Sequence, residues 1–442
     1  MTHPDPPVLL RALFDRAVAV ADPMRVVPEH LPPRPPGRVV VVGAGKASAR
    51  MAEAVESVWG PCEGLVITRY GHARPCRGIE IVEAAHPVPD AAGAAATERM
   101  LRLLGSLGEG DFALALISGG ASSLLVAPAE GVSLADKQAV GAALLASGAP
   151  IGEMNLVRKH LSRVKGGQLA AAAFPAAMLA LLISDVPGDD PAVIGSGPTV
   201  GEPSSAGEAR QVLERWGIVP PPAVEAALAR PSGVVRPGDP RLSRATTLVA
   251  AAPSLSLGAA AEMAREAGCA VRLLGDAIEG EARETAASMA RTALAVQAGL
   301  APDAAPVVLL SGGELTVTRR GGADGVGGPN AEFALALALA LDGAPGIHAI
   351  ACDTDGVDGA AEIAGALIGP HSLAHARGQG VDPLAALNGH DAHSFFARLG
   401  DGVTTGPTLT NVNDFRAILV EPPRTRPTGP PLAPLDPRPP SP

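Results

Sequence analysis

Short apolar runs alternate with helix-like segments along almost the whole chain, and this alternation limits the possible folds more than any other feature. Several runs, such as residues 39–42, are continuous rather than alternating, which is typical of strands covered on both faces. Repeated strand, glycine turn and helix therefore predict an α/β fold with mostly parallel sheets. The predicted strands are 38–42, 64–68, 79–83, 112–117, 178–184, 246–250, 270–274, 306–310, 347–352 and 416–420.

The length of 442 residues favours two domains. The alternation breaks at 230–244, where the sequence RPSGVVRPGDPRLSR is rich in Pro, Gly and Arg. We therefore predict one domain over 1–240 and a second over 241–420. Residues 421–442 contain ten prolines, which favours a disordered or polyproline II tail because proline supports neither a helix nor a strand ladder.

Composition and charge exclude several classes of protein. The net charge of -10 and the lack of Lys/Arg runs argue against a nucleic-acid partner. No segment of about 18 residues is purely apolar, so we predict no membrane span. The four cysteines are scattered without C-x-x-C spacing, which fits neither a disulfide framework nor a zinc site. The N-terminus has no signal-peptide pattern, and we expect a cytoplasmic protein.

The first strand runs into a Gly-Ala-Gly-Lys turn formed by Gly43, Gly45 and Lys46. The turn fails the Walker pattern, and it fails the dinucleotide fingerprint because Ser48 stands where the third glycine belongs. The next strand ends at Arg69 rather than at an acidic residue, which disfavours NAD and leaves NADP barely open. A helix N-terminus with Lys46 in its first turn favours an anion. The alternative is a solvent-exposed lysine after a packing turn.

A second glycine turn, at 118–123, follows a buried strand and could cradle phosphate or carboxylate through amides and hydroxyls. Its candidate residues are Ser118, Gly119, Gly120, Ser122 and Ser123. The alternative is a tight strand-to-helix turn. The similar Ser-Gly-Gly-Glu turn at 311–314 carries less chemistry, and we interpret it as structural.

Acidic and polar loops follow other predicted strands. The long loop 183–203 and the loop 351–359 are rich in carboxylates that could hold Mg²⁺, although such loops are often Asx turns. The carboxylates are Asp185, Asp189, Asp190, Asp353, Asp355 and Asp358. A further polar loop, 405–414, contains Asn411, Asn413 and Asp414. Ligands of α/β sheets bind at the carboxyl ends of strands, so these loops predict one shared site.

Residues 155–170 form the densest basic segment, which includes Arg163 and Lys165. This segment is either a solvated helix face or a source of cations for an anionic substrate. His86 precedes a proline in a rigid loop, and a lone histidine of this kind is more often structural than catalytic.

Seven of these motifs together resemble the glycerate 2-kinase family with a C-terminal MOFRL domain, some members of which are labelled hydroxypyruvate reductases. The motifs are GAGKAS, EAAHPVPD, LISGGASSLL, VRKHLSRVKGGQLA, ISDVPGDDPAVIGSGPT, DTDGVDG and TGPTLTNVND. The resemblance implies two α/β domains, the first Rossmann-like, with the active site in the cleft between them. It implies phosphorylation of D-glycerate by ATP and Mg²⁺ at the 2-hydroxyl, to give 2-phospho-D-glycerate. Lys46 matches the family's active-site lysine.

Roles follow from this resemblance as hypotheses. Lys46 would balance charge on the transferred phosphoryl group, and the 118–123 turn would bind phosphates beside Gly43 and Gly45. Asp355 or Asp189 would orient the substrate hydroxyl. The remaining assignments are Asp189, Asp190 and Asp353 for Mg²⁺, and His86, Arg163, Lys165 and Asn330 for glycerate, with Arg163 or Lys165 on its carboxylate.

The chain departs from the family at one segment. The family reads GGRNQEFAL with a functional arginine, whereas Pro329 and Ala331 replace the arginine and the glutamine here. Proline suits the first turn of a helix, so the departure concerns catalysis rather than folding. Two alternatives therefore remain: a hydroxypyruvate reductase that uses NAD(P)H, and a non-catalytic ligand-binding homologue. We expect small-molecule partners only, with a possible homodimer.

Overall fold

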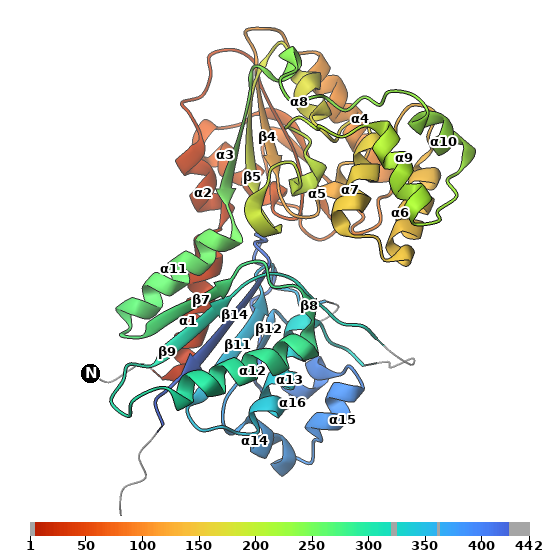
Figure 1. Cartoon of the computed structure of the whole chain (residues 1–442). Helices are drawn as coiled ribbons and strands as arrows, with labels where there is room; N and C mark the ends of the chain where they lie inside the picture. The colour runs from red at the N-terminus through yellow and green to blue at the C-terminus, as the bar shows by residue number, and fades with distance from the viewer. Residues whose placement is uncertain (1–4, 320–324, 360–362, 424–442) are drawn as a thin grey trace, which may run out of the picture.

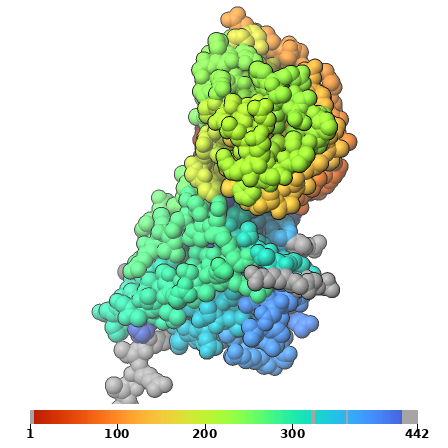
Figure 2. All heavy atoms as spheres, turned by 45° about the vertical axis from the view of Figure 1, so that its right-hand side comes forward, coloured from red at the N-terminus to blue at the C-terminus, as the bar shows by residue number. Residues whose placement is uncertain are grey.

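The computed structural model describes residues 5–319, 325–359 and 363–423, which fold into two α/β units stacked one above the other (Figure 1). Each unit is built around a six-stranded sheet. A space-filling view shows the units as two lobes that meet end to end (Figure 2). The predicted fold class of two α/β domains is confirmed.

All six strands of the first sheet run parallel. Their spatial order is β3-β2-β1-β4-β5-β6, so the chain order reverses between β1 and β4. This order is that of the Rossmann fold, as predicted for the first domain. The strands are β1 (Val39–Ala44), β2 (Glu63–Arg69), β3 (Ile79–Ala84), β4 (Phe112–Ile117), β5 (Ala177–Ile183) and β6 (Ala245–Ala251).

Helices cover both faces of the first sheet, which explains its continuous apolar strands. One face packs against α2 (Pro23–His30) and α3 (Ser48–Trp59). The other packs against α4 (Ala91–Gly105), α5 (Ala121–Leu124) and α8 (Gln168–Ala173). Every residue of β1 is buried as a result.

A separate apolar cluster lies beside the first sheet and is built from helices alone. Its helices are α6 (Leu134–Ser147), α7 (Ile151–His160), α9 (Ala206–Arg215) and α10 (Pro222–Leu228). Three short 3-10 turns complete this unit: η1 (Pro187–Asp189), η2 (Ile194–Ser196) and η3 (Pro240–Leu242).

The second sheet has the order β13-β12-β11-β14-β9-β7 and is mostly antiparallel, with β7 and β9 as its parallel pair. The prediction of mostly parallel sheets is therefore wrong for this unit. A continuous apolar run reports burial on both faces and does not fix strand direction. The strands are β7 (Ala270–Gly275), β9 (Val307–Ser311), β11 (Ile347–Asp353), β12 (Gly365–Ile368), β13 (Gly402–Val403) and β14 (Asp414–Val420).

Helices also cover both faces of the second sheet. One face packs against α12 (Ala282–Ala298) and α13 (Pro329–Leu341), which α14 (Ser372–Gly378), α15 (Pro383–Asn388) and α16 (Ala392–Leu399) extend. The other face packs against α1 (Pro6–Ala19) and α11 (Pro253–Glu266). Figure 1 shows α1 beside α11, so the chain begins in the second unit before it builds the first.

The two sheets divide the chain differently from the predicted boundary at 240/241. Strand β6 at 245–251 pairs with β5 and so belongs to the first sheet. Helix α1 packs on the second sheet although it lies within 1–240. The sequence does not indicate that α1 belongs to the second unit, because its apolar face resembles that of any other surface helix. Most of the Pro-rich tail, 424–442, lies outside the described residues.

Each of the ten predicted strands corresponds to an observed strand. The strands that were not predicted are short: β8 (Gly280–Glu281), β10 (Leu315–Thr316), β12 and β13. Runs of two to four residues are too short to show a periodic pattern. Among the described residues, no helix is long and apolar enough to cross a membrane.

Candidate active site

A pocket of about 430 Å³ lies between the carboxyl ends of the first sheet and loops of the second unit. The first unit contributes Lys46, Arg69, His86, Gly120 and Asp185, which end or follow β1 to β5 in turn. The second unit contributes Glu314, Pro329, Asn330, Asp353, Asp355, Asn411, Asn413 and Asp414, among others. The pocket therefore occupies the predicted place between the two domains.

The first-unit wall of this pocket is built at the switch point of the sheet. β1 and β4 are neighbours, and the chain leaves them in opposite directions, which opens a crevice at their carboxyl ends. Lys46 follows β1, and its backbone N–H donates to Gly119 O at 2.8 Å in the turn after β4. α3 begins at Ser48, so Lys46 lies just before the helix and not in its first turn.

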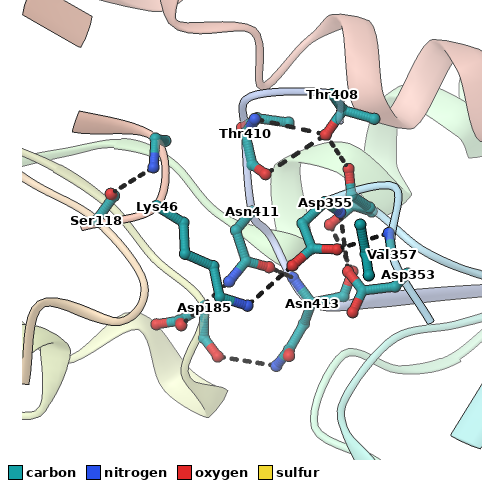
Figure 3. Close-up of polar contacts among 12 residues, drawn as sticks. Lys46, Ser118, Asp185, Asp353, Asp355, Val357, Thr408, Thr410, Asn411 and Asn413 are labelled. Carbon is teal, nitrogen blue, oxygen red and sulfur yellow. Dashed lines mark hydrogen bonds and ion pairs between the residues drawn. The ribbon is translucent and has the colours of Figure 1, made fainter. Parts of the chain in front are cut away.

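Lys46 links the two units through an ion pair. Its Nζ lies 2.9 Å from Asp355 Oδ2, and the two side chains are 17% and 4% exposed. Figure 3 shows the ammonium group directed toward Asp355, with Asp185 beside it. Burial alone would lower the pKa of Lys46, but Asp355, Asp353 and Asp185 outweigh it and raise that pKa. The ammonium group therefore stays charged at neutral pH.

Acidic side chains crowd the rest of the pocket. Burial, together with Asp355 and Asp414, raises the pKa of Asp353 well above its usual range. Burial also raises the pKa of Glu314, with Asp414 and Asp185 adding to the effect. Burial is likewise the main cause of the raised pKa of Asp185, which Lys46 partly offsets. The pocket therefore has an excess of carboxyl groups, contributed by both units, that a cation would stabilise.

Asp185 is held in place by contacts from both units. Asn411 Nδ2 donates to Asp185 Oδ2 at 3.3 Å, and Asn413 Nδ2 donates to the Asp185 backbone oxygen at 2.8 Å (Figure 3). A Cβ atom on Gly119 would lie 2.1 Å from Asp185 Oδ2 and 2.6 Å from Asn411 Nδ2. Gly119 is therefore required for the close approach of these two side chains.

The N-terminus of α13 forms another part of the second-unit wall. Asp358 accepts hydrogen bonds from the backbone N–H groups of Asn330 (2.9 Å) and Ala331 (2.8 Å). Asn330 Nδ2 donates to Asp414 Oδ1 at 2.7 Å, and its Oδ1 atom is buried without a hydrogen-bond partner. Pro329 is the first residue of α13 and lines the pocket, so it occupies the helical position that the sequence predicts.

The hydroxyl groups of the 118–123 turn are used within the first unit. Ser118 is fully buried, and its Oγ accepts a hydrogen bond from Ala47 N at 3.0 Å. Ser122 Oγ lies 2.8 Å from Ser196 Oγ, and Ser123 Oγ donates to Gly120 O. None of these three serines lines the pocket. Gly120 does line it, so the backbone rather than the hydroxyls faces a ligand.

Gly43 and Gly45 serve the packing of β1 against β4. A Cβ atom on Gly43 would lie 2.5 Å from Leu116 O, and one on Gly45 would lie 2.1 Å from Ser118 Oγ. Gly45 also has a φ of +139°, which side-chain-bearing residues rarely adopt. The faces where a phosphate could approach these glycines are therefore filled by β4 and its turn.

Asp189 and Asp190 lie outside the pocket, in contrast to Asp353 and Asp355. Asp189 Oδ2 accepts a hydrogen bond from Ser254 Oγ at 3.3 Å. Asp190 Oδ1 accepts one from Ala192 N at 2.8 Å, as in an Asx turn. The structure does not bring the predicted Mg²⁺ residues together, because the chain leaves the sheet after Asp185 and carries Asp189 and Asp190 away. Within the described ranges, no group of three or more His, Cys, Asp or Glu side chains is placed to hold a metal ion.

Arg163 and Lys165 also lie outside the pocket. Arg163 is exposed and forms an ion pair with Glu98. Lys165 is fully buried, donates to Leu125 O at 3.2 Å, and has its pKa lowered well below the usual range by burial. His86 does line the pocket, where burial, Lys46 and Arg69 lower its pKa to about 4. His86 is therefore neutral at pH 7.

Five polar pocket residues have no role assigned from the sequence: Arg69, Glu314, Asn411, Asn413 and Asp414. Asp185 is one of the carboxylates that the sequence offers for Mg²⁺, and the asparagines belong to a strand-end loop, but the sequence does not show which positions of these loops face inward. Glu314 belongs to the turn that was interpreted as structural. The dinucleotide pattern relates Arg69 only to a nucleotide site. Its position at the end of β2 also places it at the edge of the sheet where ligands bind.

Comparison with known proteins identifies relatives along most of the chain. Residues 9–229 match a family described as a domain of unknown function (DUF4147), and residues 307–414 match the MOFRL family. A protein of Agrobacterium vitis named as a candidate hydroxypyruvate reductase is 53% identical, over 93% of this chain and 94% of its own length. The D-glycerate 2-kinase of Thermotoga maritima is 38% identical, over 92% of this chain and 97% of its own length.

Solved structures agree with these sequence matches. The crystal structure of glycerate kinase from Thermotoga maritima has a TM-score of 0.84 and 37% identity, covering 93% of this chain and 99% of its own. A Pyrococcus horikoshii protein of known structure has a TM-score of 0.80 and 32% identity, covering 96% of this chain and 100% of its own. The fold, the pocket and both family matches thus lead to one conclusion: the chain belongs to the glycerate kinase family, with a DUF4147 region followed by a MOFRL domain.

Proposed function

We propose that this protein is a glycerate 2-kinase, which transfers a phosphoryl group from ATP to the 2-hydroxyl of D-glycerate and yields 2-phospho-D-glycerate. The observation that carries the proposal is the buried Lys46–Asp355 pair, which joins the two units inside an acidic pocket at the sheet's switch point. Relatives named glycerate kinases align with nearly the whole chain and support this reading. The enzyme is accordingly a phosphotransferase with an alcohol acceptor.

Phosphoryl transfer requires in-line positioning and cations near the transferred group, with little covalent work by the protein. Lys46 is fixed by Asp355 and supplies the positive charge on the first-unit wall. The 2-oxygen of glycerate would attack the γ-phosphorus while the bond to the ADP oxygen breaks. A carboxylate next to Lys46 would accept the hydroxyl proton, and Asp355 and Asp185 are the candidates for this role.

The donor set of the pocket fits Mg²⁺ of the kind that travels with a nucleotide. Mg²⁺ typically takes one or two carboxylates and completes its shell with waters and phosphate oxygens, so a dedicated cage of side chains is not required. Asp353, whose pKa is raised by burial and by neighbouring carboxylates, would gain most from a nearby cation. We propose Asp353 and Asp185 as the residues that hold the ion, with Asp185 in place of Asp189 and Asp190. When bound, Mg²⁺ neutralises charge on the phosphate oxygens.

A hydroxypyruvate reductase would require a nicotinamide site. The first unit has the strand order of a dinucleotide-binding fold, but two of its residues do not fit a bound dinucleotide. A dinucleotide fold needs an acidic residue after the second strand for the ribose hydroxyls, whereas β2 ends at Arg69. The second glycine of that motif must leave room for a pyrophosphate, whereas Ser118 Oγ fills that side of Gly45. The non-catalytic alternative rests on Pro329, which stands where the family resemblance implies a functional arginine.

One pair of assays tests the proposal. Purified protein with Mg²⁺ and ATP should release ADP only when D-glycerate is present, and it should not oxidise NADH or NADPH with hydroxypyruvate. Coupling the product to enolase without added phosphoglycerate mutase should give a signal, because enolase acts on the 2-phosphate. NAD(P)H oxidation without ADP release would establish the reductase, and silence in both assays would favour the non-catalytic homologue.

We also propose a cytoplasmic location and a possible homodimer. The location is supported by the four cysteines, all of which are free thiols. Analytical ultracentrifugation would give the oligomeric state directly.

A further inference from the structure

Arg69 is a cation of the pocket for which the described part of the chain supplies no acidic partner. It is the last residue of β2, two positions beyond the pairing of Ile67 with Ala44, and therefore lies at the same sheet edge as Lys46. Lys46 and Arg69 are the lysine and arginine that line this pocket, and Lys46 is already paired with Asp355. Within the described residues, the Arg69 guanidinium forms no ion pair and no hydrogen bond, which leaves its donors available.

Neighbouring arginines on the first unit behave differently. Arg38 pairs with Glu63, Arg74 with Glu53 and Arg99 with Glu80. Arg69 lies at the opposite end of β2 from Glu63, and its partly exposed side chain lines the pocket without meeting a carboxylate of the described residues. A partly buried guanidinium loses hydration without gaining a counter-ion, so the arrangement favours an anion from outside the chain.

The surroundings of Arg69 show which part of a ligand fits there. His86, whose ring would lie 3.1 Å from a Cβ atom on Gly120, has its pKa lowered chiefly by burial and then by Lys46 and Arg69, so it is neutral and does not compete for an anion. The second-unit wall carries the carboxyl groups of Glu314, Asp353 and Asp414, and among its described residues no cation lines the pocket. An anionic group of the acceptor substrate is therefore better placed on the Arg69 side.

The planar guanidinium group offers two parallel N–H donors that match the two oxygens of a carboxylate. The basic residues proposed for this role from sequence, Arg163 and Lys165, are held elsewhere by Glu98 and Leu125. Pro329, on the opposite wall, has no donor to offer. Among the described residues that line the pocket, these observations leave Arg69 as the group that can bind a substrate carboxylate.

We propose that Arg69 binds the carboxylate of the acceptor and thereby restricts the enzyme to 2-hydroxy acids, with the 2-hydroxyl directed toward Lys46 and Asp185. This inference rests on the proposed kinase function. It extends that function by naming the residue that distinguishes a hydroxy acid from a neutral polyol. Arg69 also explains why β2 ends in a cation where a dinucleotide fold has a carboxylate.

The test compares Arg69→Gln, Arg69→Lys and the control Arg102→Gln, an exposed arginine on α4. Each is assayed with D-glycerate and with glycerol, which has no carboxylate, and D-glycerate binding is measured by calorimetry without ATP. Arg69→Gln should raise KM for D-glycerate about 30-fold or more, with kcat reduced far less and the KM for ATP unchanged. Its kcat/KM for glycerol should stay within about twofold, so the preference for the acid collapses. Arg69→Lys should fall between the two, and Arg102→Gln should match the wild type.

The outcomes separate this inference from the proposed function. If the wild type phosphorylates D-glycerate and Arg69→Gln keeps its KM and its calorimetric affinity, the inference is overturned and the kinase assignment stands. A raised KM for ATP with an unchanged KM for D-glycerate would place Arg69 on the nucleotide and also overturn it. If the wild type transfers no phosphoryl group, the calorimetric loss of D-glycerate binding in Arg69→Gln still supports the carboxylate site. No binding by the wild type overturns both.

Discussion

The two walls of the pocket differ in charge, and the difference follows from the sheets that carry them. The wall of the parallel first sheet presents fixed cations, Lys46 and Arg69, at the ends of adjacent strands. The wall of the mostly antiparallel second unit presents carboxyl groups, several of which have raised pKa values because they are buried together. One side therefore suits anions and the other suits a metal ion or a proton. The exception on the first side is Asp185, a buried carboxyl group that follows β5 and lies where the two walls meet.

The largest effect should come from Lys46→Met, which removes the charge where the walls meet. We expect kcat to fall about 10²-fold or more, because the loss of one preorganised electrostatic group in a closed site costs on the order of 3–4 kcal/mol. The variant should also lose some stability, because Asp355 is 4% exposed and would be left among other carboxyl groups without a counter-ion. Steady-state kinetics and thermal unfolding measure the two effects.

The double variant Lys46→Met/Asp355→Asn is the control. It should recover most of the melting temperature without recovering activity, since the unpaired charge is gone but the cation is still missing. Wild-type turnover in Lys46→Met would show that Lys46 only connects the two units.

The two units can also be compared at two similar glycine turns. Each sheet has a strand followed by Ser-Gly-Gly, at 118–120 in the first unit and at 311–313 in the second. In the first, a Cβ atom on Gly119 would meet a carboxylate oxygen of Asp185 at 2.1 Å, which is the end of a side chain that can move. In the second, Gly313 has a φ of +103°, and its Cβ would lie 2.3 Å from the backbone N and O of Ile278. Gly119→Ala should therefore displace a pocket residue, whereas Gly313→Ala should strain the backbone.

We expect Gly119→Ala to reduce kcat/KM for D-glycerate up to about 10²-fold with a small change in melting temperature, because displacement of a reactive group by about 1 Å can cost that much. Gly313→Ala should lose about 1–3 kcal/mol of stability instead, from an unfavourable backbone conformation. Activity per folded molecule and the free energy of unfolding distinguish the two variants. Equal loss of stability in both would show that the first turn is structural as well.

The fold was predictable from sequence where a residue pattern has one physical cause. Buried strands and glycine turns predicted the ten main strands and the position of the pocket, because apolar runs report burial directly. Strand direction in the second unit was not predictable, since β14 inserts between β9 and β11 from a distant part of the chain. The same reason hid the attachment of α1 to the second sheet.

Individual site residues were harder to predict than the loops that carry them. Asp185 and Asp189 lie four positions apart in one loop, and only the bend of the chain decides that the first faces the pocket. Arg163 and Lys165 belong to a conspicuous basic segment, but one is exposed and the other is fully buried. Lys46 was easier, because it directly follows a buried strand at the switch point of a parallel sheet.

Pro329 offers a test of the charge difference between the two walls from the side of the second unit. It lines the acidic wall at the first position of α13, where an arginine would add a cation opposite Lys46. Pro329→Arg should raise kcat/KM for D-glycerate at least about tenfold, or roughly 1.4 kcal/mol, if the wild type lacks this charge. Stability should change little, because a first helical turn accepts either residue, although an arginine there opposes the helix dipole by a few tenths of a kcal/mol.

An unchanged or lower rate in Pro329→Arg, measured against a wild type that is already fast, would mean that another cation serves the transition state. Arg163 and Lys165 cannot fill this role because they lie outside the pocket, and Arg320 lies outside the described residues. Arg69 would then be the cation to test in the same background.

The pH dependence of stability should come from the acidic wall and not from the cationic one. Asp358 accepts the α13 backbone N–H groups, and burial raises its pKa to about 7, although those hydrogen bonds act in the opposite direction. Its pKa in the unfolded chain is about 3.9. The unfolded state therefore loses this proton first as pH rises, and the contribution of Asp358 to stability is greatest below about pH 4 and is lost through pH 7.

Between about pH 5 and 6.5 this single group should lower the free energy of unfolding by about 1.4 kcal/mol per pH unit. Asp358→Asn cannot ionise, so its stability should depend less steeply on pH than that of the wild type, even if its absolute stability is lower after the loss of one acceptor oxygen. Urea unfolding at a series of pH values measures both slopes. Arg69→Gln leaves Asp358 and its hydrogen bonds unchanged, so this variant should keep the wild-type slope. Parallel slopes for Asp358→Asn and the wild type would show that Asp358 is ionised in the folded protein, and that the acidic wall already holds its negative charge without a bound cation.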